Sequence, residues 1–296
     1  MQKEIRGTGV ALITPFYPDG TVDYDSLRTL VDFTVINGVD FIVALGTTAE
    51  SATLSHEEKR LIMDTILSAN RQRVPIVIGI GGNCTSEVCK NISEWDFTGI
   101  AAILSVAPFY NKPSQEGIYL HFKKIAETSN IPLILYNVPS RTVVNIDSNT
   151  VIRLANDCKN IIGIKEASGN FSQITEIIKN APNEFIVLSG DDFTTLPLLS
   201  LGGHGVISVI GNALPQQTAL MVHKALMGDF RMAREMHFLM HSLLTLVFQQ
   251  GNPSGIKALL NTSKKCSNIL RLPLLPVTND LYQLIALESE KIHCQS

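Results

Sequence analysis

Residues 161–169 read Ile-Ile-Gly-Ile-Lys-Glu-Ala-Ser-Gly, so an apolar run ends in a lysine, Lys165. The isoleucines and the glycine are typical of a buried strand, where an ammonium is unfavourable unless it is paired or neutralised. Lysine loses its proton readily when it is buried, and a neutral amine attacks ketones. Lys165 is therefore a candidate Schiff-base nucleophile. The alternative is a lysine whose side chain reaches water and pairs with Glu166.

Other side chains that suit this chemistry follow further apolar runs: Thr47, Thr48, Tyr110, Tyr136 and Arg141. Imine formation needs proton transfers, and a tyrosine hydroxyl linked to a threonine and a second tyrosine can pass protons to and from solvent. An arginine can hold a carboxylate through two parallel hydrogen bonds. A lysine, a proton relay and an anion clamp together indicate a class I, cofactor-free aldol reaction on a 2-keto acid.

Each of these residues also has a purely structural interpretation. A tyrosine such as Tyr136 at the end of an apolar strand is often packed, with its hydroxyl bonded to backbone. Thr47 and Thr48 can cap a turn, and Arg141 can be an exposed charge on a loop. The combination is more specific than any single member.

Three other motifs do not predict a metal or a cofactor. Asp191 and Asp192 suggest a metal at first, but capping of the following helix is the simpler interpretation. His204 lies among glycines and is interpreted as part of a loop. Residues 79–82 begin like a dinucleotide-binding turn, yet the third glycine of that motif would fall at Cys84.

The chain alternates apolar runs with helical patterns, and this alternation must position the reactive side chains. The predicted strands span residues 9–14, 41–45, 75–80, 101–106, 133–136, 161–165, 185–188 and 205–209. Helical spacing of apolar residues follows each strand, in one case after a capping box that begins at Ser55. Eight such units predict an α/β protein, a (β/α)8 TIM barrel over residues 1–228, and residues 229–296 predict a C-terminal helical appendage. The strand ends meet at one cavity, and they carry Thr47, Thr48, Tyr110, Tyr136, Arg141, Lys165, Gly190 and Ile207.

Composition excludes several classes of partner. The 296 residues carry a net charge of −3, with acidic and basic residues scattered, so no basic stripe indicates nucleic-acid binding. No apolar run reaches the ~18 residues of a membrane span, and residues 1–6 lack the apolar region of a secretory signal. The cysteines are odd in number and lack C-x-x-C spacing, which indicates a reducing compartment and predicts the cytoplasm. They are Cys84, Cys89, Cys158, Cys266 and Cys294.

Four motifs in this order resemble the dihydrodipicolinate synthase family. They are residues 46–51, 136–142, 163–169 and 189–192. The resemblance extends from about Thr8 to the end of the predicted barrel and continues more weakly through residues 252–253 and 270–273. It implies condensation of pyruvate with aspartate semialdehyde in lysine and diaminopimelate synthesis.

The resemblance also implies roles for individual residues. Lys165 would form the Schiff base with pyruvate, and Tyr136 would be the general acid and base, relayed through Thr47 to Tyr110. In the family this last tyrosine comes from the neighbouring subunit, and members are commonly homotetramers. Thr48 would bind the pyruvate carboxylate.

Three further positions complete the implied substrate site. Gly190 and Ile207 would contribute backbone groups, and Arg141 would hold the carboxylate of aspartate semialdehyde. The fourth place of the turn at residues 46–51 is usually glycine in the family and is Ala49 here. Its methyl group either crowds the backbone near the pyruvate carboxylate or requires an ordinary φ at this position.

Many members of the family are inhibited by lysine at a dimer interface. The matching positions are Ser51, Ala52, His56, Asn83, Glu87 and Phe109. A histidine that often accompanies them is Lys59 here, and its cation would repel the ammonium of the ligand. We expect inhibition that is retained but weaker.

Two alternatives to this function stay open from the sequence. Another Schiff-base 2-keto-acid aldolase, such as N-acetylneuraminate lyase, would share Lys165. Arg141 discriminates, because a small aldehyde with a carboxylate suits a guanidinium whereas a sugar suits hydroxyl-binding groups. The second alternative is a catalytically silent barrel that binds small molecules.

Overall fold

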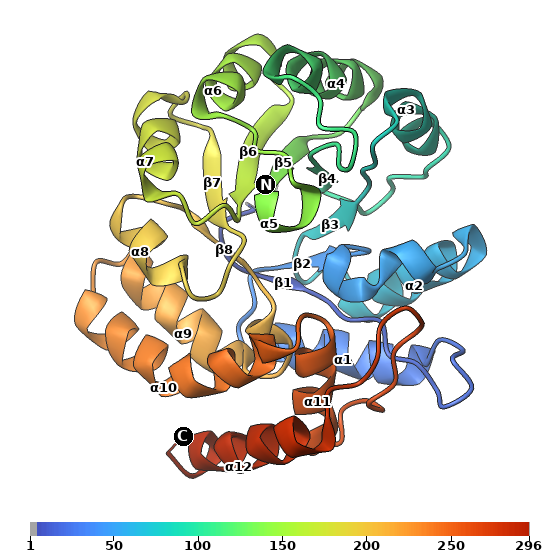
Figure 1. Cartoon of the computed structure of the whole chain (residues 1–296), viewed down its shortest axis with the longest axis vertical. Helices are drawn as coiled ribbons and strands as arrows, with labels where there is room; N and C mark the ends of the chain where they lie inside the picture. The colour runs from blue at the N-terminus through green and yellow to red at the C-terminus, as the bar shows by residue number, and fades with distance from the viewer. Residues whose placement is uncertain (1–4, 296) are drawn as a thin grey trace.

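Eight parallel strands close into a barrel in the computed structural model, which describes residues 5–295 (Figure 1). Each strand pairs with the next in the chain, and β8 pairs with β1, so the predicted TIM barrel is confirmed. The strands are β1 Gly7–Ala11, β2 Phe41–Ala44, β3 Ile76–Gly79, β4 Ala102–Val106, β5 Leu133–Asn137, β6 Ile161–Glu166, β7 Ile186–Ser189 and β8 Gly205–Ser208. Residues 1–4 and the side chain of Cys294 lie outside the described residues.

The strands are apolar on both faces because both faces are buried. Inward residues such as Phe41, Val43 and Leu104 form one cluster inside the barrel. Their neighbours, such as Ile42 and Ile103, form a larger cluster beneath the helices. This burial explains why the strands appear in the sequence as continuous apolar runs rather than as alternating patterns.

Eight helices follow the eight strands and surround them (Figure 1). They are α1 Tyr24–Ile36, α2 His56–Asn70, α3 Thr85–Ser93, α4 Gln115–Thr128, α6 Ser148–Asp157, α7 Phe171–Asn180, α8 Thr195–Ser200 and α9 Pro215–Leu226. Asp23 and Ser114 cap α1 and α4 with their side chains, and Ser55 forms the predicted capping box with Glu58 at the start of α2. Among the described residues, no helix is both long enough and apolar enough to cross a bilayer.

The first strand begins and ends earlier than predicted. Residues 9–14 were expected in it, but β1 is Gly7–Ala11, and Leu12 makes the last backbone hydrogen bond to β2, with the oxygen of Val43 3.0 Å away. Ile13 donates its backbone N–H to the side-chain oxygen of Asn212, 3.1 Å away, instead of to a neighbouring strand. The sequence pattern shows apolar burial, and it cannot show which buried backbone is paired in the sheet.

The C-terminal part contains three helices that pack together on one side of the barrel (Figure 1). They are α10 Phe230–Gln249, α11 Ser254–Thr262 and α12 Asn279–Gln295. Helix α11 exposes no face to solvent over residues 254–260, because all of these residues are buried. The predicted boundary at residues 228–229 falls between α9 and α10, and the division of the chain into two domains at this point stays a prediction.

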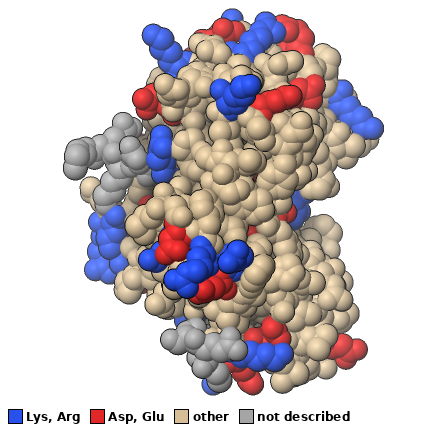
Figure 2. All heavy atoms as spheres, turned by 90° about the vertical axis from the view of Figure 1, so that its left-hand side faces the viewer, with Lys and Arg blue, Asp and Glu red and all other residues tan. Residues whose placement is uncertain are grey.

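Charges are unevenly distributed on the side of the molecule formed by α7, α8, α9 and α10. Figure 2 shows acidic and basic side chains intermixed at the top of this face and again in its lower half, with an uncharged surface between these two regions. Exposed apolar side chains on these elements include Leu220, Leu226, Phe230 and Phe238. This face therefore offers an apolar contact surface and no continuous basic one.

Arg271 fastens the segment before α12 to the barrel. Its guanidinium donates to Glu58 on α2 and to the backbone oxygens of Gly20 and Thr53, each 2.9 Å away. The hydrogen bond from Arg271 is the main reason that the pKa of Glu58 falls from its ordinary 4.5 to about 2. The charged form of Glu58 therefore stabilises the fold above pH 4.5, and this contribution is lost as the pH falls towards 2.

Replacing Glu58 with glutamine tests this attachment, because glutamine keeps the capping box but lacks the charge. We expect Glu58→Gln to lower the free energy of unfolding by about 1–2 kcal/mol at pH 7, allowing for solvent screening. The difference from wild type should shrink as urea denaturation is repeated at successively lower pH. Glu116→Gln, which breaks the exposed pair with Arg153, is the matched control and should change stability by a few tenths of a kcal/mol. A loss independent of pH would contradict the assignment.

Candidate active site

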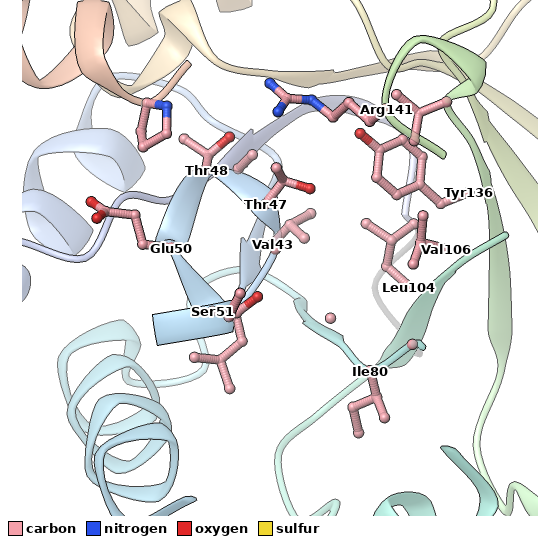
Figure 3. A pocket seen from close by; sticks show the side chains of 18 of the residues that line it. Val43, Thr47, Thr48, Glu50, Ser51, Ile80, Leu104, Val106, Tyr136 and Arg141 are labelled. Atoms are coloured by element: carbon pink, nitrogen blue, oxygen red, sulfur yellow. The ribbon is translucent and has the colours of Figure 1, made fainter. Parts of the chain in front are cut away.

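A cavity of about 890 Å³ opens at the carboxyl ends of the strands (Figure 3). Residues at or just beyond the ends of all eight strands line it, which is where TIM barrels place their active sites. Of the predicted site residues, those that line it are Thr47, Thr48, Tyr136, Arg141, Lys165 and Gly190. In Figure 3, Thr47, Tyr136 and Arg141 extend towards the same part of the cavity. The fold thus brings together residues that are far apart in the sequence.

Lys165 lies inside the barrel beside Tyr136. The two residues are register partners on β6 and β5, and the amine nitrogen is 4.3 Å from the centre of the tyrosine ring. The lysine side chain is only 6% exposed although it lines the cavity. The alternative of a lysine that reaches water is therefore wrong. An amine next to a phenol within an apolar wall is the arrangement that imine chemistry requires.

Glu166 does not pair with Lys165, because successive side chains of a strand point to opposite faces. Its buried carboxylate accepts hydrogen bonds at 3.0 Å from the side-chain amides of Asn137 and Gln173, and one from the backbone N–H of Ser168. Asn137 directly follows Tyr136 in the chain. The carboxylate thus joins β5 and β6 on the outer face, just behind the two reactive side chains.

Gly190 is required by the position of the lysine. A Cβ atom at this residue would lie 3.0 Å from two carbons of the Lys165 side chain and 2.7 Å from Cβ of Ala167. The backbone N–H of Gly190 donates to the oxygen of Glu166, 2.8 Å away, so the glycine cannot retreat without breaking this bond. Glycine is therefore the residue at this position that leaves room for the observed conformation of the Lys165 side chain.

The turn after β2 presents two threonines to the cavity from the short 3-10 helix η1 Thr47–Ala49. Thr48 is buried, and its hydroxyl oxygen accepts a hydrogen bond of 2.9 Å from the side-chain amide of Asn252. Thr47 is exposed, and within the described part of the chain no hydrogen bond joins it to Tyr136. Thr47 and Tyr136 therefore both line the cavity, but the hydrogen bond that the predicted relay needs between them is not formed.

Ala49 fits the turn without strain. The left-handed conformations of this turn fall on Leu45, with φ 55°, and on Glu50, with φ 54°. Ala49 itself is helical and buried, and its backbone oxygen accepts a hydrogen bond of 2.8 Å from the hydroxyl of Thr14. Of the two consequences considered for a methyl group here, the ordinary φ is the one observed.

Arg141 reaches the cavity from a helix that the sequence did not indicate, α5 Pro139–Thr142. Four residues are too few to show a helical period. Its guanidinium donates to the backbone oxygen of Asn252, 3.3 Å away, at the entry to α11. Asn252 was not among the predicted site residues, although it contacts both Thr48 and Arg141 and lines the cavity.

Two of the predicted catalytic and substrate-binding residues do not line the cavity of this chain. Tyr110 is 82% exposed and lies outside it, so the expectation that barrel geometry alone brings both phenols together is wrong. The polypeptide turns away at Tyr110, which has φ 76°. Ile207 is buried in the barrel interior below the cavity wall. A role for Tyr110 in a neighbouring subunit stays a prediction.

The two aspartates after β7 have structural roles that differ from each other. Asp191 accepts hydrogen bonds from the backbone N–H groups of Phe193 and Thr194 in the turn before α8, whose N-cap residue is Thr194, so it stabilises this turn and is not the predicted helix cap. Asp192 does not cap that helix either, so the prediction is wrong for both. Its carboxylate is buried and accepts from the hydroxyl of Ser208, 2.6 Å away, and from two backbone N–H groups beyond β8. Residues 5–295 contain no group of three side chains able to hold a metal.

Comparison with known proteins identifies the family. Residues 4–289 match the model of the dihydrodipicolinate synthetase family. The chain belongs to this family. It is 52% identical to 4-hydroxy-tetrahydrodipicolinate synthase of Parabacteroides distasonis over 95% of each chain, and 50% identical to that of Phocaeicola vulgatus over 99% of this chain and 100% of that one. The crystal structure of dihydrodipicolinate synthase from Aquifex aeolicus superposes with a TM-score of 0.94 at 40% identity, covering 98% of both chains.

The cavity extends beyond the threonine turn to several of the positions predicted to bind an inhibitor. Ser51, Ala52, His56 and Phe109 line this outer part, together with Lys59. Burial lowers the pKa of Lys59 from its usual value. Two predicted positions, Asn83 and Glu87, do not line the cavity, although the side-chain amide of Asn83 donates to the backbone oxygen of Phe109, 3.3 Å away. The outer part therefore has a cationic wall.

Replacing Gly190 with alanine tests the fit around the lysine. The added methyl group must displace Lys165 or Ala167, and a displacement near 1 Å at a reacting group lowers rates by about a hundredfold. We expect Gly190→Ala to slow formation of the borohydride-trapped pyruvate adduct on Lys165, measured by mass spectrometry, by about tenfold to a hundredfold. Gly117→Ala in α4 is the control, because its Cβ meets nothing closer than 3.4 Å. An adduct formed at the wild-type rate by Gly190→Ala would contradict the steric assignment.

Proposed function

We propose that this chain is a lyase that condenses pyruvate with L-aspartate 4-semialdehyde to give 4-hydroxy-tetrahydrodipicolinate. This reaction is the first committed step of diaminopimelate and lysine biosynthesis, which places the enzyme in the cytoplasm. The observation that carries the proposal is the buried Lys165 amine, 4.3 Å from the Tyr136 ring, in a cavity that Thr48 and Arg141 also line. The names of the two bacterial relatives support the same reaction.

The proposed mechanism begins at the amine of Lys165. The nitrogen attacks the ketone carbon of pyruvate, and the carbinolamine loses water to form an imine. Loss of a proton from the pyruvate methyl group gives an enamine, whose terminal carbon attacks the aldehyde. The amino group of the semialdehyde then adds to the imine carbon and releases Lys165, so that one water leaves overall. Tyr136 donates and accepts the protons of these steps, with Thr47 as the next relay member.

The two carboxylates of the substrates would be held at opposite sides of the reacting carbons. Thr48 accepts its hydrogen bond from Asn252, so its own O–H is free to donate to the pyruvate carboxylate. Gly190 adds backbone groups beside the lysine. Arg141 offers a guanidinium to the carboxylate of the semialdehyde. A relative from Acinetobacter baumannii, 36% identical with a TM-score of 0.95, was solved in complex with pyruvate, which supports the first substrate.

Assembly would complete the proton relay. Tyr110 projects from this chain at 82% exposure, and a homotetramer would insert it into a neighbouring cavity. The uncharged part of the face formed by α7, α8, α9 and α10 supports contact between copies (Figure 2). Assembly is not uniform among relatives, because one at 36% identity and a TM-score of 0.95 is described as a monomeric variant.

Lysine is the proposed inhibitor, bound weakly in the outer part of the cavity. A relative from Cyanidioschyzon merolae, 35% identical with a TM-score of 0.94, was solved with lysine bound. In this chain Lys59 lines that region, and its positive charge opposes the ammonium groups of the ligand. The same region contains Trp95, the single tryptophan of the sequence, which therefore reports on occupancy.

Arg141→Ala tests the second substrate in a coupled assay with both substrates. Wild type should condense them, and the variant should raise the KM for the semialdehyde by about tenfold to a hundredfold, because a charged hydrogen bond to its carboxylate is lost. The KM for pyruvate should change far less. The control is Arg153→Ala, which removes an exposed guanidinium outside the cavity.

Two results would overturn the assignment. Equal effects of Arg141→Ala on both KM values would remove the reason to prefer the semialdehyde over the sugar substrate of a related aldolase. A wild-type protein that forms no borohydride-trapped pyruvate adduct on Lys165 would be a binding protein rather than an aldolase.

Lys59→His tests the effect of the cation on lysine binding. Removing the fixed charge should lower the lysine concentration that halves activity by about threefold to tenfold. A titration followed by the fluorescence of Trp95 should show the same shift. Lys124→His, at an exposed lysine that pairs with Glu127, should leave inhibition unchanged. Identical inhibition of wild type and Lys59→His would show that the cation does not control this region.

A further inference from the structure

A buried ion pair connects the C-terminal helices to the turn that carries the two threonines. The amine of Lys257 on α11 is 2.5 Å from a carboxylate oxygen of Glu50, and both side chains are completely buried. The amine also donates to the backbone oxygen of Ile269, 2.9 Å away, and lies 4.1 Å from the centre of the Phe16 ring. The other Glu50 oxygen accepts the backbone N–H of Arg271 at 3.0 Å.

Glu50 is placed so that its side chain controls the shape of the turn. It has φ 54° and links the two short 3-10 helices, η1 Thr47–Ala49 and η2 Ser51–Thr53. Its backbone N–H donates to the oxygen of Thr47 at 3.1 Å, and its backbone oxygen accepts from Thr53 at 2.9 Å. A left-handed residue with a long side chain is strained unless its surroundings hold it. Here the Lys257 amine and the backbone N–H of Arg271 hold the Glu50 carboxylate.

A second contact joins the same C-terminal segment to the same turn. Asn252, five positions before Lys257, donates from its side-chain amide to the hydroxyl oxygen of Thr48. The turn is therefore held on its outer side by α11 and the residue preceding it, and not by the barrel strands alone. The two contacts act on Thr48 and Glu50, and both of these residues line the cavity.

Stability alone does not explain a buried ion pair in this place. Burial lowers the pKa of Lys257 from its usual value, and the charge of Glu50 only opposes that effect. Well-packed apolar residues of similar volume stabilise a core as well as a buried pair does. What such residues cannot provide is a directional contact of fixed length. The pair is therefore suited to fixing the conformation of the turn that contains Glu50.

We propose that Lys257 is a positioning residue for the condensation, which fixes Thr47 and Thr48 against pyruvate through the carboxylate of Glu50. The C-terminal helices are then a working part of the active site rather than only a support for the barrel. This inference rests on the proposed function. In this inference Lys257 does not touch the substrate and acts only through Glu50.

Lys257→Met removes the ammonium and keeps most of the volume. We expect kcat/KM for pyruvate to fall by about tenfold to a hundredfold, because a displaced turn misplaces both threonines. The KM for the semialdehyde should change by less than about threefold, since Arg141 lies on α5. The rate of borohydride trapping with pyruvate alone should fall in parallel with kcat/KM.

Two controls separate positioning from loss of stability. Lys224→Met breaks the partly exposed pair with Asp229, 3.7 Å away, and should leave all kinetic constants unchanged. Ile125→Ala, in the core beneath α4, should lower the melting temperature without altering the ratio of the two KM values. Glu50→Gln weakens the same contact from the other side, so it should reproduce the kinetic effect even where Lys257→Met does not fold.

The outcomes distinguish this inference from the proposed function. A wild-type protein that condenses the substrates, with Lys257→Met or Glu50→Gln at wild-type kcat/KM for pyruvate, would overturn the positioning role. A wild-type protein that forms no pyruvate adduct would overturn the proposed function. In that case a crystal structure of Lys257→Met, or of Glu50→Gln, decides the inference. A displaced turn at residues 46–51 supports it and an unmoved turn refutes it.

Discussion

Closure of the barrel between β8 and β1 is the constraint on which the whole site depends. The two strands approach so closely at Gly205 and Gly7 that a side chain at Gly205 would collide with the backbone of Gly7. Gly205 also has φ 150°, which few residues other than glycine adopt. With this seam closed, all eight carboxyl ends meet at one cavity. In an open sheet of the same strands, Thr48 and Arg141 would not line the same cavity.

The alternation of side chains along β6 then separates two charged groups that are adjacent in the sequence. Lys165 points into the barrel and Glu166 points outward, where amides and a backbone N–H bind its carboxylate. If the two had paired, the lysine would be a salt-bridged cation and a poor nucleophile. Because side chains alternate along the strand, the group beside the Lys165 amine is the phenol of Tyr136 and not the carboxylate of Glu166.

The sequence predicts the barrel and most of the inner site because both depend on local patterns. Apolar runs locate the strands, and the residue after each run locates the strand end. It does not predict Lys257 or Asn252 as partners of the threonine turn, since these contacts join residues 207 and 204 positions apart. From the strand pattern, the sequence also places Tyr110 in the cavity of its own chain. This placement is wrong because the backbone turns outward at Tyr110, where φ is 76°, and the apolar pattern of a strand does not indicate such a turn.

These long-range contacts explain why a barrel of this kind benefits from a C-terminal appendage. A loop between a strand and a helix is fixed by the fold only at its two ends, and the residues between keep conformational freedom that blurs a reacting geometry. Lys257, Asn252 and Arg271 each contact the turn at residues 46–51 from outside the barrel. These three contacts from the C-terminal part of the chain restrain the conformation of the turn, as hydrogen bonds to neighbouring strands restrain a strand in a sheet. Thr47 and Thr48 can then lie on a loop and still be held as firmly as residues on a strand.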